Sequence, residues 1–328
     1  MKLLFAHARI NLLGGSEAVL ELLVRATLKA GYDVRAWSAQ ERGPMADRIA
    51  ALGVPVVGAL EELGDWRPDL VHLMQSPLTA AAVASRWPEV PRICTVHGMV
   101  DAEAPDPSSR LVVAVSEETA EAVKLKHWIP ADRVRIVRNG VNLAIYKPGP
   151  YDGSGDVVYW GRVMPDREAA IVAAIDATAV LGRTLRLHGP DVPEASAAAI
   201  EMCAKRGVPV TIRGPTWDGW PAFSGAALVV ANGRSALEAM AAGLPTWIVG
   251  AGGADGFIAS PTIFWASARK NFSGRTKLCT DSIARCCGDL KAVRKATLKL
   301  RRFLQVEFST DAMVRAYLQV YSLACQRP

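Results

Sequence analysis

Two arginines in the second half of the chain have a spacing that suits a diphosphate. Arg162 and Arg167 lie in the segment 159–167, YWGRVMPDR, where they flank an expected helix start. Guanidinium groups neutralise phosphate charge and offer paired N–H donors, and a helix N-terminus adds a partial positive charge. The segment therefore predicts a diphosphate contact. The alternative interpretation is a pair of solvated surface arginines.

A glycine pair near the N-terminus is a second candidate for binding an oxyanion. Gly14 and Gly15 lie in NLLGGSE at 11–17, between an expected strand and an expected helix. Glycines let backbone N–H groups approach an oxyanion at a helix N-terminus. The segment is neither a complete G-x-G-x-x-G nor a P-loop, so a plain tight turn remains the alternative.

Two histidines come at the ends of apolar runs. His97 closes TVHG at 95–98, and His188 holds a similar place before Gly189 in the second half. Ligands in open α/β sheets bind outside the carboxyl ends of the strands. His97 is therefore a candidate to hydrogen-bond a sugar hydroxyl or a phosphate. A loop histidine satisfied within the protein explains the pattern equally well.

An acidic residue lies about one turn into another expected helix. The segment 232–245, NGRSALEAMAAGLP, places Glu238 after Gly233 and Arg234. A carboxylate has two acceptor oxygens and can take two ribose hydroxyls, while the helix start offers donors to phosphate. Taken alone, Glu238 is equally consistent with a charge on a helix face.

The elements that position these residues alternate between strand-length apolar runs and helical patterns. Strands are expected at 2–8, 33–38, 54–58, 69–74, 92–97, 111–116, 134–138, 157–161, 184–188, 210–213, 227–231 and 246–249. Helices are expected at 16–29, with Ser16 as N-cap, and at 78–87, 117–126, 167–180, 194–206, 234–242 and 311–323. Such alternation predicts an α/β protein with parallel, doubly wound sheets.

A glycine- and proline-rich segment, KPGPYDGSGD at 147–156, interrupts the alternation and predicts a linker. Two Rossmann-like domains facing a central cleft are therefore expected. They span 1–148 and 149–307, and a last helix occupies 308–328.

Composition limits the class of protein. The chain has 328 residues, is 50% hydrophobic and lacks an apolar run of about eighteen residues, so no membrane span is expected. The first residues fit a strand better than a signal peptide, because polar side chains interrupt them. The six cysteines are scattered, which predicts reduced thiols in the cytoplasm and no zinc site. They are Cys94, Cys203, Cys279, Cys286, Cys287 and Cys325.

Positive charge gathers near the C-terminus. The region 269–302 holds eleven Lys and Arg residues against Asp281 and Asp289, a local excess of +9 in a chain of net charge +6. Such a region can bind nucleic acid, rest on an anionic membrane beside a lipid acceptor, or form a solvated face.

Together these segments resemble glycosyltransferase family 4, a group of retaining, two-domain GT-B enzymes. The similar segments follow the family order through most of the chain. They are GGSE at 14–17, RPDLVHL at 67–73, TVHG at 95–98, VSEETAEAVKLKHWIPADRVRIVRNGVN at 115–142, GRVMPDR at 161–167, LEAMAAGLP at 237–245 and FSTDAMVRAYLQVY at 308–321. The resemblance implies transfer of a sugar from a nucleotide diphosphate to an unidentified acceptor.

The resemblance also implies roles for the candidate residues. The diphosphate of a donor such as a UDP-sugar would meet the Gly14 and Gly15 amides, Arg162 and Arg167, with Gly233 and Arg234 nearby. Glu238 would bind the ribose, and His97 would act at the transferred sugar. Gly214 and Trp217 lie where the family approaches the nucleobase. Retention, independence from metal, the absence of another cofactor and a C-terminal helix that returns to the N-terminal domain are further implications.

One departure from the family affects the reaction itself. The family has a second glutamate eight residues before the position of Glu238, where this chain has Val230. Asn232 or Asp255 is a candidate to replace its polar contact. A catalytically degenerate nucleotide-binding subunit is therefore an alternative to a DNA-modifying or lipid-directed transferase. A dinucleotide oxidoreductase is disfavoured, because no complete G-x-G-x-x-G with an acidic partner is present.

Overall fold

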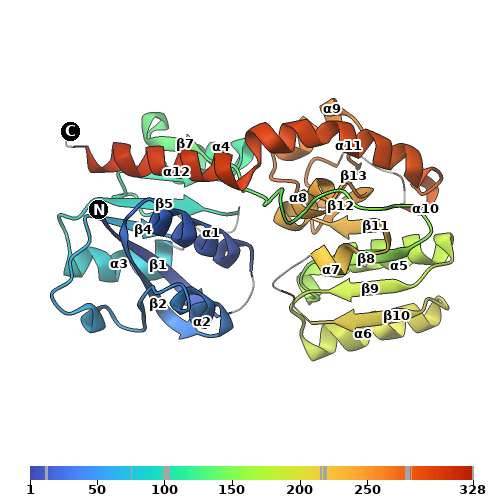
Figure 1. The fold of residues 1–328 in the computed structure, drawn as a ribbon, viewed down its shortest axis with the longest axis horizontal. Helices are drawn as coiled ribbons and strands as arrows, with labels where there is room; N and C mark the ends of the chain where they lie inside the picture. Colours follow the sequence, from blue (N-terminus) through green and yellow to red (C-terminus); the bar gives the residue numbers. More distant parts are fainter. Residues whose placement is uncertain are drawn as a thin grey trace. The chain divides into compact units, whose positions relative to one another are not determined.

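The computed structural model describes residues 1–11, 14–74, 76–98, 104–214, 216, 220–277, 281 and 283–326. The chain forms two compact domains (Figure 1). The N-terminal domain comprises Met1–Gly140 and Thr310–Pro328, and the C-terminal domain comprises Val141–Ser309.

The N-terminal domain is built on a seven-stranded parallel sheet of order β3-β2-β1-β4-β5-β6-β7. Its strands are β1 (Lys2–Ile10), β2 (Asp33–Arg42), β3 (Val56–Val57), β4 (Leu70–Leu73), β5 (Arg92–Val96), β6 (Leu111–Ala114) and β7 (Val134–Ile136). Its helices are α1 (Gly15–Lys29), α2 (Pro44–Ala50), α3 (Ser76–Arg86), α4 (Glu117–Lys126) and α12 (Thr310–Cys325).

Apolar side chains on both faces of this sheet explain its two hydrophobic cores. Strand residues Leu3 and Phe5 pack into one cluster with α1 and α12, while Leu4 and Ala6 point into the other. This alternation follows the two-residue period of a strand. The returning helix α12 contributes Tyr317 and Tyr321 to the first cluster, and the last segment of the chain thereby becomes part of the N-terminal core.

The C-terminal domain has a six-stranded sheet of order β10-β9-β8-β11-β12-β13. Its strands are β8 (Asp156–Trp160), β9 (Leu185–His188), β10 (Val210–Arg213), β11 (Ala226–Ala231), β12 (Thr246–Gly250) and β13 (Gly253–Phe257). All neighbours pair in parallel except β12 and β13, which are antiparallel. The helices are α5 (Glu168–Leu181), α6 (Pro193–Lys205), α7 (Trp220–Phe223), α8 (Gly233–Ala241), α9 (Pro261–Ala268), α10 (Ile283–Cys286) and α11 (Leu290–Glu307).

The predicted α/β class with two doubly wound domains and a returning C-terminal helix is confirmed. Two local features differ from the expectations. Gly14, not Ser16, is the N-cap of α1, because the Ser16 hydroxyl donates to Glu17 Oε2 at 2.9 Å instead of capping the helix. The antiparallel strand β13, which begins at the end of the glycine-rich segment 250–253, was not among the expected strands.

Within the described part of the chain, every helix is too short or too polar to cross a membrane.

Candidate functional site

The carboxyl edge of the C-terminal sheet gathers three of the expected loops around β8. Trp160, the last residue of β8, pairs with His188 of β9 on one side and with Ala231 of β11 on the other. The loops that follow these strands therefore begin side by side. This edge is where ligands bind in doubly wound sheets.

The two arginines of the first loop converge on one oxygen atom. Arg162 Nη2 lies 3.1 Å from Asp166 Oδ2, and Arg167 Nε lies 3.3 Å from the same atom. Both guanidiniums stay open to solvent, with side-chain exposures of 46% and 26%. Two guanidiniums that share one carboxylate oxygen can also share a phosphate oxygen. The structure thus brings together the pair for which a diphosphate contact is expected.

Glu238 is buried and already has two partners in the protein. Its Oε2 accepts a hydrogen bond of 2.7 Å from the Trp160 indole Nε1, and its Oε1 lies 3.3 Å from Arg234 Nη2. Only 7% of the residue is exposed. The carboxylate consequently faces the end of β8 as an oriented acceptor, and a bound hydroxyl has to share it with these two donors.

The start of α8 uses several of its polar groups internally. Gly233 has φ +56°, and its N–H donates to the carbonyl of Phe272 at 2.7 Å. The Asn232 side chain donates to the carbonyl of Val249 at 3.1 Å. These contacts fix the loop but occupy the Gly233 donor expected to meet phosphate.

The position of the missing glutamate lies inside the core. Val230 is fully buried in β11 and packs in the cluster beneath α5. Asp255, a candidate to replace it, is also buried, and it accepts hydrogen bonds from the Ser267 hydroxyl and from Thr276 N. Of the base-contact candidates, Gly214 directly follows β10, and Trp217 lies outside the described residues.

His188 sits beside this site in an unusual environment. It is 6% exposed, and neither ring nitrogen has a hydrogen-bond partner among the described residues. Burial, together with the nearby positive charges of Arg186 and Arg213, lowers the pKa of His188 to about 4. Its ring centroid lies 5.9 Å from that of Trp160. The imidazole is therefore neutral at pH 7 and retains unused donor and acceptor capacity.

In the N-terminal domain, the glycine pair opens α1 after β1. A Cβ atom on Gly14 would clash with Glu17 Oε2, whereas one on Gly15 would meet nothing within 4 Å. The Glu17 carboxylate folds back over the first turn, where a negative charge is stabilised by the helix dipole. An incoming oxyanion would compete with this carboxylate.

Three histidines gather at the carboxyl ends of adjacent strands in the same domain. His7 belongs to β1, His72 to β4, and His97 follows β5. His97 is partly exposed, but its Nε2 is buried without a partner among the described residues, as is His7 Nε2. Burial lowers the pKa of His97 to about 4 and that of His7 to about 3. All three rings are held neutral, because burial lowers the pKa of His72 as well.

A buried hydroxyl network fixes the middle histidine. Tyr321 Oη lies 2.9 Å from His72 Nδ1, and Thr95 Oγ1 lies 2.7 Å from His72 Nε2. Thr95 Oγ1 is also 3.1 Å from Tyr317 Oη. The returning helix α12 therefore supports the strand end that carries His97.

This cluster predicts acid-sensitive stability of the N-terminal domain. Unfolded histidines bind protons below pH 6.5, but His7 and His97 resist protonation until about pH 3 and 4. Their contribution is therefore present above pH 6.5 and is lost as the pH falls, by roughly 3 kcal/mol for each at pH 4. Urea unfolding should show that the free energy of unfolding decreases as the pH is lowered from 7 to 5, a range in which most carboxyl groups do not yet titrate.

A His7→Gln/His97→Gln variant should show a flatter pH dependence than the wild type. His127→Gln, at the end of α4, serves as the control that keeps the original slope. Equal slopes in all three proteins would contradict the assignment to the buried pair.

Several of these contacts were not expected from the sequence. Trp160 and Asp166 lie in the segment 159–167 that was singled out, but nothing in its composition predicted the bond of Trp160 to Glu238 or the contacts of Asp166 with the two arginines. His7 and His72 lie inside apolar strands, where the only available signal was a polar residue in an apolar run.

Comparison with known proteins agrees with this description. Residues 13–145 match the sequence profile of Glycosyltransferase Family 4. A sequence search of curated proteins gave no significant match.

Solved structures share the fold along the whole chain. HepE of Anabaena, in complex with UDP and glucose, has a TM-score of 0.72 and 18% identity over 98% of this chain and 100% of its own. A glycosyltransferase from Rickettsia africae has a TM-score of 0.73 and 15% identity over 100% and 99%. WaaG, a glycosyltransferase of lipopolysaccharide biosynthesis, has a TM-score of 0.64 and 12% identity over 96% and 98%. The chain thus has the GT-B fold and resembles glycosyltransferase family 4, and both findings support a transferase enzyme.

Proposed function

We propose that the protein transfers a sugar from a UDP-sugar to an acceptor, with the donor bound at the carboxyl edge of the C-terminal sheet. The observation that carries this proposal is the convergence of Arg162 and Arg167 on one oxygen position, at the edge where Glu238 also lies. We propose UDP as the nucleotide of the donor because HepE, which shares the fold, binds UDP.

In this proposal the donor diphosphate displaces Asp166 from the two guanidiniums. Arg162 and Arg167 then stabilise the charge that develops on the leaving diphosphate, an electrostatic role that requires no metal ion or other cofactor. Glu238 accepts ribose hydroxyls while Trp160 and Arg234 hold its carboxylate in place. His97, neutral and with a buried Nε2, contacts the transferred sugar. Retention of configuration follows from the resemblance to family 4.

A nucleotide-binding subunit without turnover is the second candidate, and the position of Val230 favours it. Its side chain is buried in β11, so no carboxylate extends from this position. Such a protein would bind UDP at the same arginines but would not release sugar from any donor.

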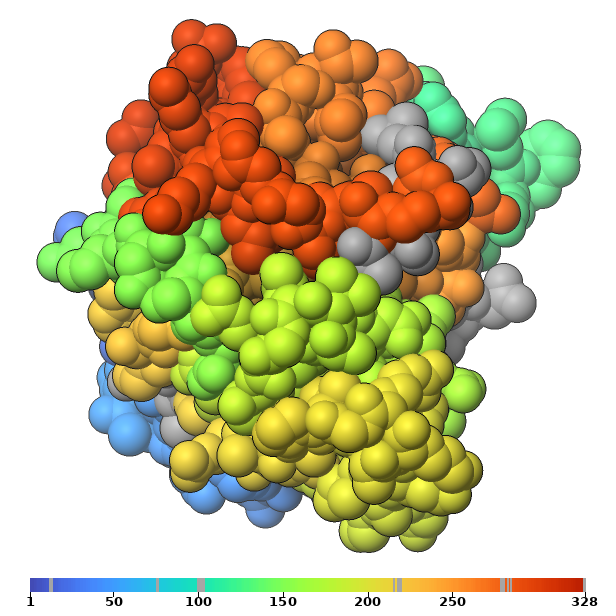
Figure 2. Space-filling model, turned by 90° about the vertical axis from the view of Figure 1, so that its right-hand side faces the viewer, coloured from blue at the N-terminus to red at the C-terminus, as the bar shows by residue number. Residues whose placement is uncertain are grey.

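We further propose that the basic C-terminal region contacts an anionic surface through α11, which lies exposed in orange-red on the face drawn in Figure 2. Two of its arginines bind backbone carbonyls: Arg294 that of Gly149, and Arg301 those of Ala241 and Leu143. Other cations on the helix are exposed: Lys291, Lys295, Lys299 and Arg302. Two of the positive charges on α11 therefore stabilise the fold, and the other four face solvent.

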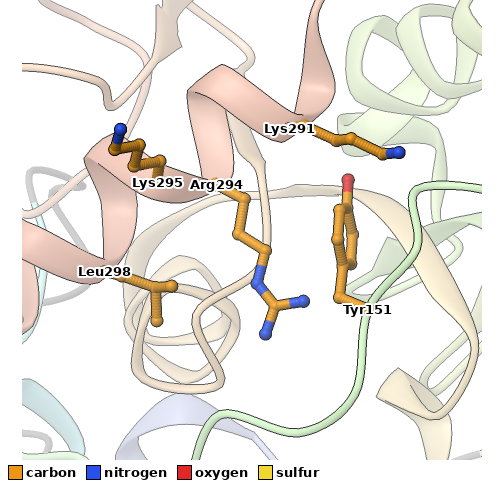
Figure 3. A pocket seen from close by; sticks show the side chains of 5 residues that line it. All are labelled: Tyr151, Lys291, Arg294, Lys295 and Leu298. Carbon is orange, nitrogen blue, oxygen red and sulfur yellow. The ribbon is translucent and has the colours of Figure 1, made fainter.

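An open pocket of about 410 Å³ beside this helix argues for an extended partner rather than one small anion (Figure 3). Arg294 stacks on the Tyr151 ring at 4.4 Å, whereas the ammonium groups of Lys291 and Lys295 point away from each other. Cations that do not converge on one point suit a spread of negative charge.

Nucleotide binding should be visible as thermal stabilisation. UDP at a hundred times its Kd should add about 2.7 kcal/mol to the stability of the domain that binds it. This corresponds to a Tm increase of several degrees for a domain of this size. The measurement compares UDP, GDP, ADP, their sugar conjugates and NAD, without added metal. A shift with NAD alone, or with no nucleotide, would contradict the proposed donor site.

A further inference from the structure

The end of α4 exposes the two most solvent-accessible large apolar side chains among the described residues. Trp128 is 85% exposed, and Leu125 is 75% exposed. Both belong to the segment Lys124–Trp128, which we term the α4 tip. Burial of an indole normally stabilises a protein, so a tryptophan left in solvent calls for an explanation.

The backbone holds Trp128 outside at a conformational cost. Its φ is +55°, in the left-handed region that bulky residues rarely adopt and that glycine usually fills after a helix. The next residue, Ile129, is buried, and its backbone N–H donates to the Val123 carbonyl oxygen, with 3.5 Å between nitrogen and oxygen. Since Ile129 turns inward, Trp128 is directed outward. The fold therefore tolerates strain to display the indole.

Positive charge accompanies the apolar side chains. Lys124 and Lys126 are exposed, and no ion pair joins either of them to a carboxylate in the part of the chain that the structure describes. Beside α4 runs the edge strand β7, in which Ile136 is 41% exposed (Figure 1). Tryptophan and leucine between lysines form the composition of an interfacial membrane anchor.

We propose that the α4 tip docks the protein on an anionic lipid bilayer. The Trp128 indole enters the headgroup layer, Leu125 reaches the boundary of the acyl chains, and Lys124 and Lys126 bind anionic headgroups. A nucleic acid would use the lysines but would gain little from Leu125. The proposal does not depend on the transferase activity, because binding to a bilayer needs no nucleotide.

The test measures partitioning of the intact protein into vesicles of phosphatidylcholine with 30% phosphatidylglycerol, taken as roughly the anionic content that gives such surfaces their potential. Trp128→Gly and Leu125→Gln should each lower the partition coefficient by about tenfold or more, because apolar area is lost from the interface. Lys124→Gln/Lys126→Gln should lower it by about 30-fold on these vesicles and leave binding to pure phosphatidylcholine unchanged.

Trp128→Gly separates a docking role of the indole from a structural role. A docking role predicts weaker vesicle binding at an unchanged Tm, whereas a structural role predicts a lower Tm. Glycine relieves the left-handed strain, so Trp128→Gly should not lower the Tm. Ile200→Gln, which removes an exposed apolar side chain from α6, is the matched control and should bind vesicles as the wild type does. A Lys295→Gln/Lys299→Gln variant measures separately how much α11 contributes to vesicle binding.

Four outcomes would overturn the proposal. They are unchanged vesicle binding by Trp128→Gly, a large loss of Tm in that variant, salt-sensitive binding to plasmid DNA in place of vesicles, and a dimer that Trp128→Gly dissociates. A dimer of this kind would mean that the α4 tip binds a second copy of the chain and not a bilayer.

Discussion

Replacing both Arg162 and Arg167 by alanine should lower turnover of the UDP-sugar by at least about 10³-fold and leave the fold intact. Loss of one preorganised donor at a developing negative charge costs about 10²–10³ in rate, and here both guanidiniums are lost. Their side chains are partly exposed and contact the same carboxylate, so neither is needed for the core. The rate to measure is sugar release from the UDP-sugar that gives the largest thermal shift.

Two control variants sharpen this prediction. Arg206→Ala removes an exposed arginine that is paired with Asp176 and lies just before the amino end of β10, not at the carboxyl edge of the sheet, and should leave turnover unchanged. Asp166→Asn should act in the opposite direction on binding, because UDP no longer displaces a carboxylate. The affinity for UDP should rise by about two- to fivefold, the usual strength of an exposed ion pair. A double arginine variant with wild-type turnover would contradict the proposed diphosphate contact.

The fold was predictable because its signals are local. Most strands of the N-terminal sheet contain a short apolar run, and α4 was expected with the bounds that the structure shows, 117–126. The errors occur where one side chain decides between alternatives. Ser16 is a good N-cap by type, but its hydroxyl bonds to Glu17, and the glycine-rich segment 250–253 forms the turn between β12 and the antiparallel strand β13. Residue preferences do not reveal such choices.

The candidate site was predictable only where its parts are close in sequence. Arg162 and Arg167 share a loop, so composition alone was enough to pair them. The Trp160–Glu238 bond spans 78 residues, and the His72–Tyr321 bond spans 249. Both depend on which strands are neighbours and on where the last helix packs. A single sequence does not specify this register, so these contacts emerge only from the fold.

Glu238→Ala should reduce both stability and nucleotide affinity, because its carboxylate has two partners in the core. The Trp160 indole N–H would lose its acceptor inside the protein, and Arg234 would lose its counter-charge. An orphaned buried donor costs about 1–3 kcal/mol, and the unpaired guanidinium adds to this. The Tm of the C-terminal domain should fall by roughly 5–10 °C at 2–4 °C per kcal/mol. Differential scanning calorimetry measures this change, and titration calorimetry with UDP measures the loss of affinity.

Glu238→Gln separates the structural role from the binding role. Its amide oxygen can still accept from Trp160, so most of the stability should return, whereas the negative charge that orients ribose hydroxyls and pairs with Arg234 is absent. UDP affinity should therefore stay at least about tenfold below that of the wild type while the Tm recovers. Trp160→Phe removes the indole donor and leaves the carboxylate, so it should lower the Tm more than it lowers affinity. If glutamine restored both quantities together, the carboxylate would serve only the core, and the ribose contact would have to be sought elsewhere along the carboxyl edge of the sheet.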